Sequence, residues 1–176
     1  TVNLLRDPEQ AASIGEPTPH TQVKLVDGEI WIHSPSVMLG YYKDADATAE
    51  MLSDRWLKTG DLGRFDETGA LYLTGRKKNL IVLSSGENIS PEYVEQLLRE
   101  TGSVREVCVS ENNDRLIAEI YPTDAVLEKD AAGREAAVLE AVNQTNQRLP
   151  FYSRIMDITV RTKEFPKNIY GKIVRA

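Results

Sequence analysis

The sequence has little cysteine, little positive charge and no long apolar run. Cys108 is the single cysteine among 176 residues, so no internal disulfide can form, which is compatible with a reducing compartment. The formal net charge of −6 argues against a nucleic-acid partner, because neutralising phosphates requires a basic face. No apolar run approaches the length of a membrane span, and no signal peptide is visible. We therefore expect a cytoplasmic protein with no transmembrane segment and no nucleic-acid partner.

The first 75 residues carry a mostly β pattern. Residues 1–20 are polar and proline-containing, and predict an extended or loop segment. The dipeptide Asp27-Gly28 suits a two-residue hairpin turn between apolar runs. Strands are expected at 23–26, 29–34, 62–65 and 70–74, and a short helix at 44–52. Tyr41 and Tyr42 are expected to pack against this segment.

The pattern changes after Arg76, where strands and helices alternate. Strands are expected at 80–83, 104–110, 115–121 and 155–160, and helices at 91–101 and 131–149. The inner face of the longer helix is assigned to Val138, Leu139, Val142 and Leu149. We expect an α+β fold in which residues 1–75 are β-rich and residues 76–176 form a small α+β domain, with a hinge at 76–79.

The stretch Gly75–Pro91 combines a basic run, an apolar run, a polar loop and a helix start. Residues 80–83 predict a short buried strand. Gly86 gives the following loop access to positive φ and lets another molecule approach the backbone closely. Ser90 is a good helix N-cap, and Pro91 suits the first helical position because its missing N–H costs nothing there.

Two other stretches share this character, namely Lys58-Thr59-Gly60-Asp61-Leu62 and Pro166–Arg175 at the end of the chain. In their order and spacing, the three stretches resemble the adenylate-forming ligases, a family that includes acyl- and aryl-CoA synthetases, luciferase and the adenylation domains of peptide synthetases. The resemblance covers essentially the whole chain. It implies that residues 1–75 are the β-rich end of a large adenylation domain and that residues 76–176 are the mobile C-terminal domain.

The resemblance implies a nucleotide-binding role for Asp61 and Arg76. A carboxylate has two acceptor oxygens and can receive both hydroxyls of a ribose, whereas Gly-Asp by itself is also ordinary in turns. A guanidinium presents a planar fork of donors suited to ribose and phosphate oxygens. Lys78 occupies the family's hinge position. On residue type alone, Arg76 and Lys78 are equally compatible with a solvated basic surface.

The resemblance also assigns a passage for the thiol acceptor and a catalytic lysine. Gly86 lies in the loop that admits the pantetheine arm, with Glu87 and Asn88 lining it, although a plain turn glycine is the alternative. Lys172 is the family's adenylation lysine, and a flexible ammonium can stabilise the charge that develops as the carboxylate attacks the α-phosphate. Asn168-Ile169-Tyr170 departs from the family, where small hydroxyl residues are commoner.

Several family segments are missing from this sequence, namely the Ser/Thr/Gly-rich phosphate loop, the aromatic-Gly-x-Thr-Glu segment and the acyl pocket. We expect them in the remainder of the large domain, upstream of Thr1. The implied partners are ATP or AMP, a carboxylic acid and CoA as co-substrate, with Mg bound outside this segment and no metal site within it. His20 and His33 are too far apart in sequence to suggest a site.

The resulting prediction is the C-terminal part of an ATP-dependent ligase that adenylates a carboxylic acid and transfers the acyl group to CoA. The loop 84–88 is more similar to fatty-acyl ligases than to peptide-synthetase domains, which favours a fatty acid and CoA. Two alternatives stay open: an adenylation domain that loads a carrier-protein thiol, and a non-catalytic nucleotide-binding or regulatory module. The 176 residues alone are expected to be inactive as a ligase.

Overall fold

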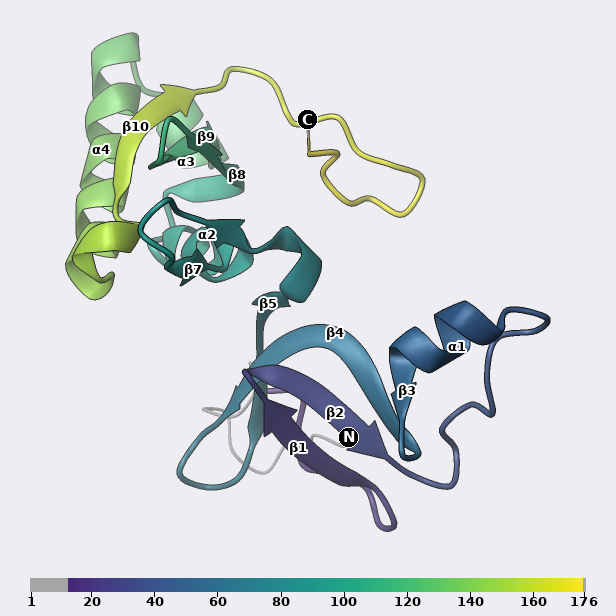
Figure 1. Ribbon diagram of the computed structural model, residues 1–176. Helices are drawn as coiled ribbons and strands as arrows, with labels where there is room; N and C mark the ends of the chain where they lie inside the picture. Colours follow the sequence, from purple (N-terminus) through teal and green to yellow (C-terminus); the bar gives the residue numbers. More distant parts are fainter. Residues whose placement is uncertain (1–12, 176) are drawn as a thin grey trace. The chain divides into compact units, whose positions relative to one another are not determined.

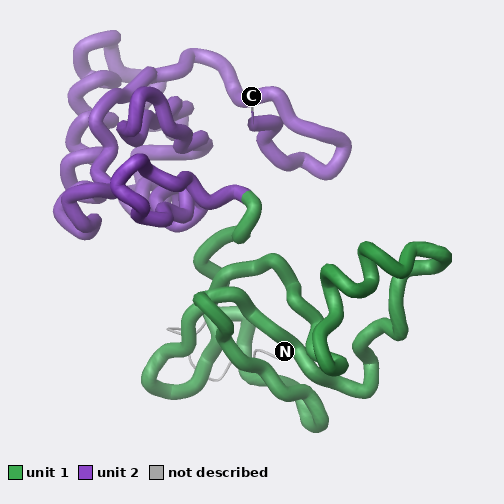
Figure 2. Tube along the Cα trace, viewed as in Figure 1, with its two compact units in different colours: residues 1–78 green, residues 79–176 purple. Residues whose placement is uncertain are grey.

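The computed structural model describes residues 13–175 and divides the chain into two compact units, residues 1–78 and 79–176 (Figures 1 and 2). Most of the loop expected at 1–20 therefore lies outside the described residues. No helix in the described range is long and apolar enough to cross a membrane. The α+β class predicted from the sequence is confirmed by mixed sheets and helices. The unit boundary falls after Lys78, inside the segment 76–79.

The first unit is built on an antiparallel five-stranded sheet. Its order is β1-β2-β4-β3, with β5 paired to β4. The strands are β1 (Gln22–Val26), β2 (Glu29–His33), β3 (Leu52–Ser53), β4 (Trp56–Phe65) and β5 (Leu71–Arg76). The Asp27-Gly28 turn is confirmed, since these residues have φ of 50° and 78° and Val26 pairs with Glu29.

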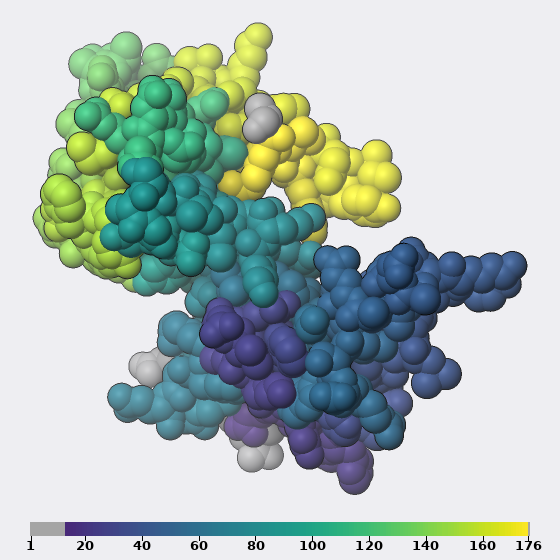
Figure 3. All heavy atoms as spheres, in the orientation of Figure 1, coloured from purple at the N-terminus to yellow at the C-terminus, as the bar shows by residue number. Residues whose placement is uncertain are grey.

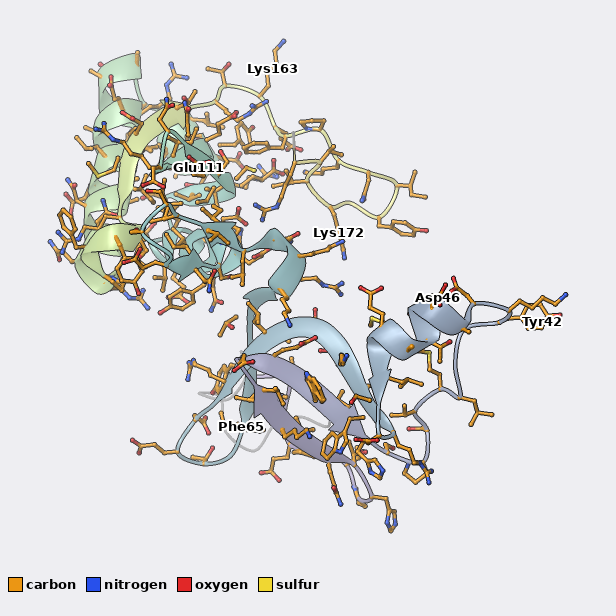
Figure 4. The ribbon with its side chains drawn as sticks, in the orientation of Figure 1. Tyr42, Asp46, Phe65, Glu111, Lys163 and Lys172 are labelled. Carbon is orange, nitrogen blue, oxygen red and sulfur yellow. The ribbon has the colours of Figure 1, made fainter. Side chains whose placement is uncertain are left out.

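Helix α1 (Ala45–Met51) begins where the Asp44 side chain accepts a hydrogen bond from the Ala47 N–H at 2.9 Å. The preceding loop is held to this helix through the main chain, because the Tyr41 N–H donates to Thr48 Oγ1 at 2.9 Å. The expected packing of the two tyrosines is wrong. Tyr42 is 88% exposed, and Tyr41 is also exposed, since the loop needs no ring contact to be fixed (Figure 4).

The second unit has a three-stranded sheet in the order β10-β9-β8. Strands β8 (Val104–Asn112) and β9 (Arg115–Pro122) form a hairpin, and β10 (Ile155–Val160) lies parallel to β9. Helix α2 (Pro91–Glu100) packs against β8, and α4 (Ala131–Arg148) against β10 and β9. Short elements complete the unit: 3₁₀ segment η2 (Lys77–Asn79) at the boundary, strands β6 (Ile81–Val82) and β7 (Asn88–Ile89), helix α3 (Asp124–Leu127), and 3₁₀ segment η3 (Phe151–Ser153).

Both long helices of this unit start and stop where their capping residues predict. Ser90 Oγ accepts from the Tyr93 N–H at the start of α2, and Gly102 follows the helix with φ of 77°. Helix α4 starts at the Asp130 cap, whose carboxylate accepts from the Gly133 N–H at 2.8 Å. Leu149 and Pro150 follow its last helical residue.

Three predictions need correction. Leu139 is 49% exposed, because it lies one helical step beyond the face that buries Val138, Ala141, Val142 and Thr145. The strand expected at 80–83 is only Ile81–Val82, and Val82 is exposed. Hydrogen bonds from the Leu83 N–H to the Glu87 carbonyl and from the Gly86 N–H to the Leu83 carbonyl close a tight turn there. Strand β8 extends two residues further than expected, and its turn is Asn113-Asp114.

Candidate functional site

Asp61 and Arg76 meet on adjacent strands of the first unit. The β4–β5 register places the two residues opposite each other, and Arg76 Nε lies 2.7 Å from Asp61 Oδ1. Their side chains are 30% and 52% exposed, so this ion pair is open to solvent. Both residues assigned to the nucleotide by resemblance therefore form one polar cluster.

Thr59 shapes the approach to this cluster. Its hydroxyl donates to the Ile30 carbonyl at 2.7 Å and accepts from the Asp61 N–H at 3.1 Å. Gly60 has φ of 70°, a backbone conformation that L side chains rarely adopt. The Thr59-Gly60-Asp61 run is thus an irregular part of β4 tied to β2, which fixes the direction of the Asp61 side chain.

Glu29, which the sequence analysis did not identify, contacts the Thr59-Gly60-Asp61 run from strand β2. Its side chain is 6% exposed, and its two oxygens accept from the Gly60 N–H and from Lys77 Nζ, each at 3.0 Å. Burial raises the pKa of Glu29, but the hydrogen bonds that its carboxylate accepts, with the one from Lys77 the strongest, and the charge on Lys77 together hold the pKa below its ordinary value. Glu29 therefore joins the Thr59-Gly60-Asp61 run to the segment that ends the unit.

An open pocket of about 510 Å³ adjoins these residues in the first unit. It is lined by Glu29, Glu50, Met51, Lys58, Thr59, Gly60, Arg76, Lys77 and Lys78. Four cationic side chains outnumber the two carboxylates of the lining, and this excess of positive charge favours an anionic ligand. Lys78, the residue assigned to the hinge, is exposed in η2 and contributes to this wall.

The Gly86 loop belongs to the second unit and connects β6 to β7. Gly86 has φ of 94°, and a Cβ added to it would meet no atom within 4 Å. The glycine is thus required here by backbone conformation, while the space beside it is open. Ser85 Oγ hydrogen-bonds to the Glu87 carboxylate, and Asn88 is an exposed residue of β7. A pocket of about 140 Å³ next to Asn88 is walled by Tyr93 and Tyr152, among others.

Lys172 lies on a C-terminal loop that protrudes from the second unit (Figures 3 and 4). The loop is a small hairpin, with hydrogen bonds from the Asn168 N–H to the Lys172 carbonyl and from the Val174 N–H to the Pro166 carbonyl, at 2.9 and 3.0 Å. Asn168 Oδ1 accepts from the N–H groups of Tyr170 and Lys172 at 2.9 and 3.0 Å. Asn168, part of the departure from the family pattern, therefore closes the turn that presents the exposed Lys172.

The assigned residues fall into three groups. Arg76 and Lys78 line one pocket of the first unit, and Asp61 is paired with Arg76. Gly86, Glu87 and Asn88 share a loop of the second unit, and Lys172 lies on the C-terminal loop of that unit. Within residues 13–175, no hydrogen bond or ion pair joins the Gly86 loop to the Lys172 loop. The described part of the chain also holds no group of three or more His, Cys, Asp or Glu residues that could hold a metal ion.

Comparison with protein families decides where this chain belongs. The sequence model of the family described as "AMP-binding enzyme C-terminal domain" matches residues 78–176, more than half of the chain. The chain belongs to this family. Its small α+β unit, from Asn79 onward, thus corresponds to the C-terminal domain of AMP-binding enzymes, which confirms the resemblance to adenylate-forming ligases.

Known relatives of this AMP-binding family member extend the match to the first unit. A long-chain-fatty-acid–CoA ligase of Salmonella typhimurium strain LT2 is 34% identical over 94% of this chain and 30% of its own length. O-succinylbenzoate coenzyme A synthetase of Bacillus subtilis, solved with ATP and magnesium, has a TM-score of 0.73 and 30% identity over 94% of this chain and 36% of that one. An amide bond synthetase of Marinactinospora thermotolerans has a TM-score of 0.76 and 28% identity over 94% and 35%. The chain thus spans about a third of the length of these relatives.

Proposed function

We propose that this chain is the C-terminal part of an ATP-dependent, AMP-forming acid–thiol ligase. The observation that carries the proposal is the family match over residues 78–176, with Lys172 presented on an ordered loop of the matched domain. The long-chain-fatty-acid–CoA ligase relatives support a fatty acid as the acid and CoA as the thiol. The remaining part of the adenylation domain would supply the acyl pocket and the groups that hold the triphosphate.

The first half-reaction would form an acyl-adenylate. A carboxylate oxygen of the acid attacks the α-phosphorus of ATP, a new P–O bond forms, and pyrophosphate leaves. Negative charge builds on the non-bridging oxygens during this attack, and the Lys172 ammonium is suited to stabilise it. The Asp61 carboxylate would accept hydrogen bonds from the ribose hydroxyls. Arg76 would orient Asp61 through their ion pair at 2.7 Å and would also donate hydrogen bonds to nucleotide oxygens.

The second half-reaction would transfer the acyl group. The thiol sulfur attacks the carbonyl carbon of the acyl-adenylate, the thiol proton is released, the carbonyl carbon–oxygen bond to the phosphate breaks, and AMP leaves. The open space beside Gly86 supports a passage for a thin thiol arm along the β6–β7 loop. Glu87 and Asn88 border that space. Lys78, at the boundary of the two units, would serve as the hinge that lets the C-terminal domain present Lys172 in one step and the Gly86 loop in the other.

The proposal is tested by pyrophosphate release with ATP and a panel of acids, measured on the intact protein that contains this chain and on the 176 residues alone. We expect turnover with fatty acids by the intact protein and only background by the isolated chain. When CoA is replaced by a phosphopantetheinyl carrier protein, no acyl thioester should form. No pyrophosphate release by the intact protein with any acid, whether or not it binds ATP, would support a non-catalytic module, and thioester formation with the carrier protein alone would support a carrier-loading enzyme.

A further inference from the structure

Two carboxylates with little solvent exposure hold the two ends of the loop that carries Lys172. At the start of the loop, Glu106 accepts from the Phe165 N–H at 3.0 Å and pairs with Lys167 Nζ at 2.5 Å. At the end, Arg175 Nη2 lies 3.0 Å from both oxygens of Glu95. The Glu106 and Glu95 side chains are 11% and 7% exposed. Both anchors are therefore ion pairs in which the carboxylate is shielded from water.

Each anchor is itself fixed by the sheet. Glu95 comes from α2, and its Oε1 accepts from the Val109 N–H of β8 at 2.8 Å, while Arg175 Nη1 donates to the Val109 carbonyl at 3.2 Å. Burial raises the pKa of Glu95, against the lowering effects of the Val109 N–H and of the charge on Arg175. Glu106 is a residue of β8. Helix α2 and strand β8 thus fix where the loop begins and ends.

The loop depends on these anchors for its position. Its own hydrogen bonds make a hairpin of very few residue pairs, and a two-stranded hairpin alone is marginally stable in water. Ile169 and Tyr170 at its tip are 91% and 80% exposed, so they contribute little packing. Phe165, at the start of the loop, is buried with 7% exposure, but the hydrophobic core cluster of the unit, which runs from Leu83 to Ile155, contains no residue of the loop. Releasing the loop should therefore leave the domain folded.

We propose that Glu95 and Glu106, acting through Arg175 and Lys167, are positioning residues that hold Lys172 in place for adenylation. This inference rests on the proposed function in one respect, namely the catalytic role of Lys172. The physical part of the inference, a two-point anchor for the loop, stands on the contacts alone. The two parts can therefore be tested separately.

The anchor is tested by amide hydrogen exchange on the 176-residue chain, comparing the wild type with Arg175→Met and Lys167→Met. The matched control is Arg148→Met, which breaks the exposed pair with Glu100 on the same unit. We expect the Asn168, Gly171 and Val174 amides to exchange about 10-fold faster in each anchor variant, since a hydrogen bond to a charged group is lost. The β8 and β9 amides should stay protected. Unchanged exchange in the loop would overturn the anchor.

A second variant controls for the charge that Arg175→Met leaves unpaired on the buried Glu95 carboxylate. Glu95→Gln combined with Arg175→Met retains an acceptor for the Val109 N–H while it removes both charges of the pair. The loop should exchange as fast in this double variant as in Arg175→Met. Protection restored to the wild-type level would show that the charge left on Glu95, and not loss of the anchor, had loosened the loop.

The positioning role is tested on the half-reactions of the intact protein. Arg175→Met should lower kcat for acyl-adenylate formation about 10-fold or more with little change in KM, because Lys172 acts on charge that builds in the transition state. Transfer from supplied acyl-adenylate to CoA should be unchanged, and Arg175→Lys should restore part of kcat. In a Lys172→Ala background, Arg175→Met should add no further loss. An additive loss, or equal slowing of both half-reactions, would overturn the positioning role even if the exchange result held.

Discussion

Asp61 and Arg76 face each other across the β4–β5 pairing, with 2.7 Å between Asp61 Oδ1 and Arg76 Nε. The pair joins two residues that the sequence resemblance assigned separately to the nucleotide. It is partly exposed, so its own contribution to stability is small, about 0–1 kcal/mol. Arg76 of this pair lines the open pocket, and we propose that the pair serves ligand recognition.

Replacing Asp61 by Asn separates these two roles. In the intact protein, Asp61→Asn should raise KM for ATP about 10-fold or more, because hydrogen bonds to a charged acceptor are lost, while the melting temperature changes little. Asp124→Asn, which breaks the exposed pair with Arg105, is the matched control and should leave KM unchanged. Steady-state kinetics measures the change in KM, and thermal melts measure the change in melting temperature. A large loss of stability without a change in KM would make Asp61 structural.

Glu29 makes the stability of the first unit depend on pH. Its pKa lies below the ordinary value of 4.5, so the stabilisation it provides is fully present above that value and is lost as the pH falls through the lower, folded-state pKa. Glu29→Gln removes this component. The difference in free energy of unfolding between wild type and variant should therefore be largest near neutral pH and shrink on acidification. A difference that stays constant with pH, measured by urea denaturation, would refute this account of Glu29.

Lys78 is the proposed hinge, and a proline there tests it. Lys78→Pro fixes φ in η2 and should impair one half-reaction more than the other, because a hinge must adopt two backbone conformations. Lys78→Ala removes the charge without fixing φ and serves as the control. The two half-reactions are measured separately, with ATP and acid or with supplied acyl-adenylate and CoA. Equal activity in both after the proline substitution would count against the hinge.

Gly86 is expected to matter for the thiol step. Gly86→Leu should slow transfer from supplied acyl-adenylate to CoA while acyl-adenylate formation continues, since a side chain would fill the open space beside the loop. Any side chain at φ of 94° also strains the backbone, so Gly69→Leu, at φ of 86° with similarly open surroundings, controls for strain. The same loss of transfer in both variants would assign the effect to strain.

Local signals accounted for much of the fold. The Asp27-Gly28 turn and the helix start at Ser90 each depend on a few neighbouring residues, and the structure has them where the sequence predicted. The predicted strand at 80–83 was shortened because hydrogen bonds of the Gly86 turn take over at Leu83. The helical periodicity also assigned Leu139 to the buried face of α4, whereas the structure exposes it. At the edge of a helix face, a shift of one residue changes a side chain from buried to exposed.

The glutamates that hold the candidate site residues in place, Glu29 and Glu95, could not be predicted from local sequence patterns. Glu29 is bound to Lys77, 48 positions away, and Glu95 to Arg175, 80 positions away. Such pairs depend on which strands become neighbours, and no local pattern distinguishes these glutamates from the surface acids around them. The motif residues were found because their types and order resemble a family. The ion pairs of Glu29 and Glu95 are recognised only from the folded structure.

Lys172 is proposed to serve adenylation and not thiol transfer, and this role is tested by comparing the two half-reactions of Lys172→Ala in the intact protein. Loss of a charge-stabilising donor should slow acyl-adenylate formation by about 10²–10³. Transfer from supplied acyl-adenylate to CoA should stay near the wild-type rate. Equal slowing of both half-reactions, or normal acyl-adenylate formation, would contradict the account.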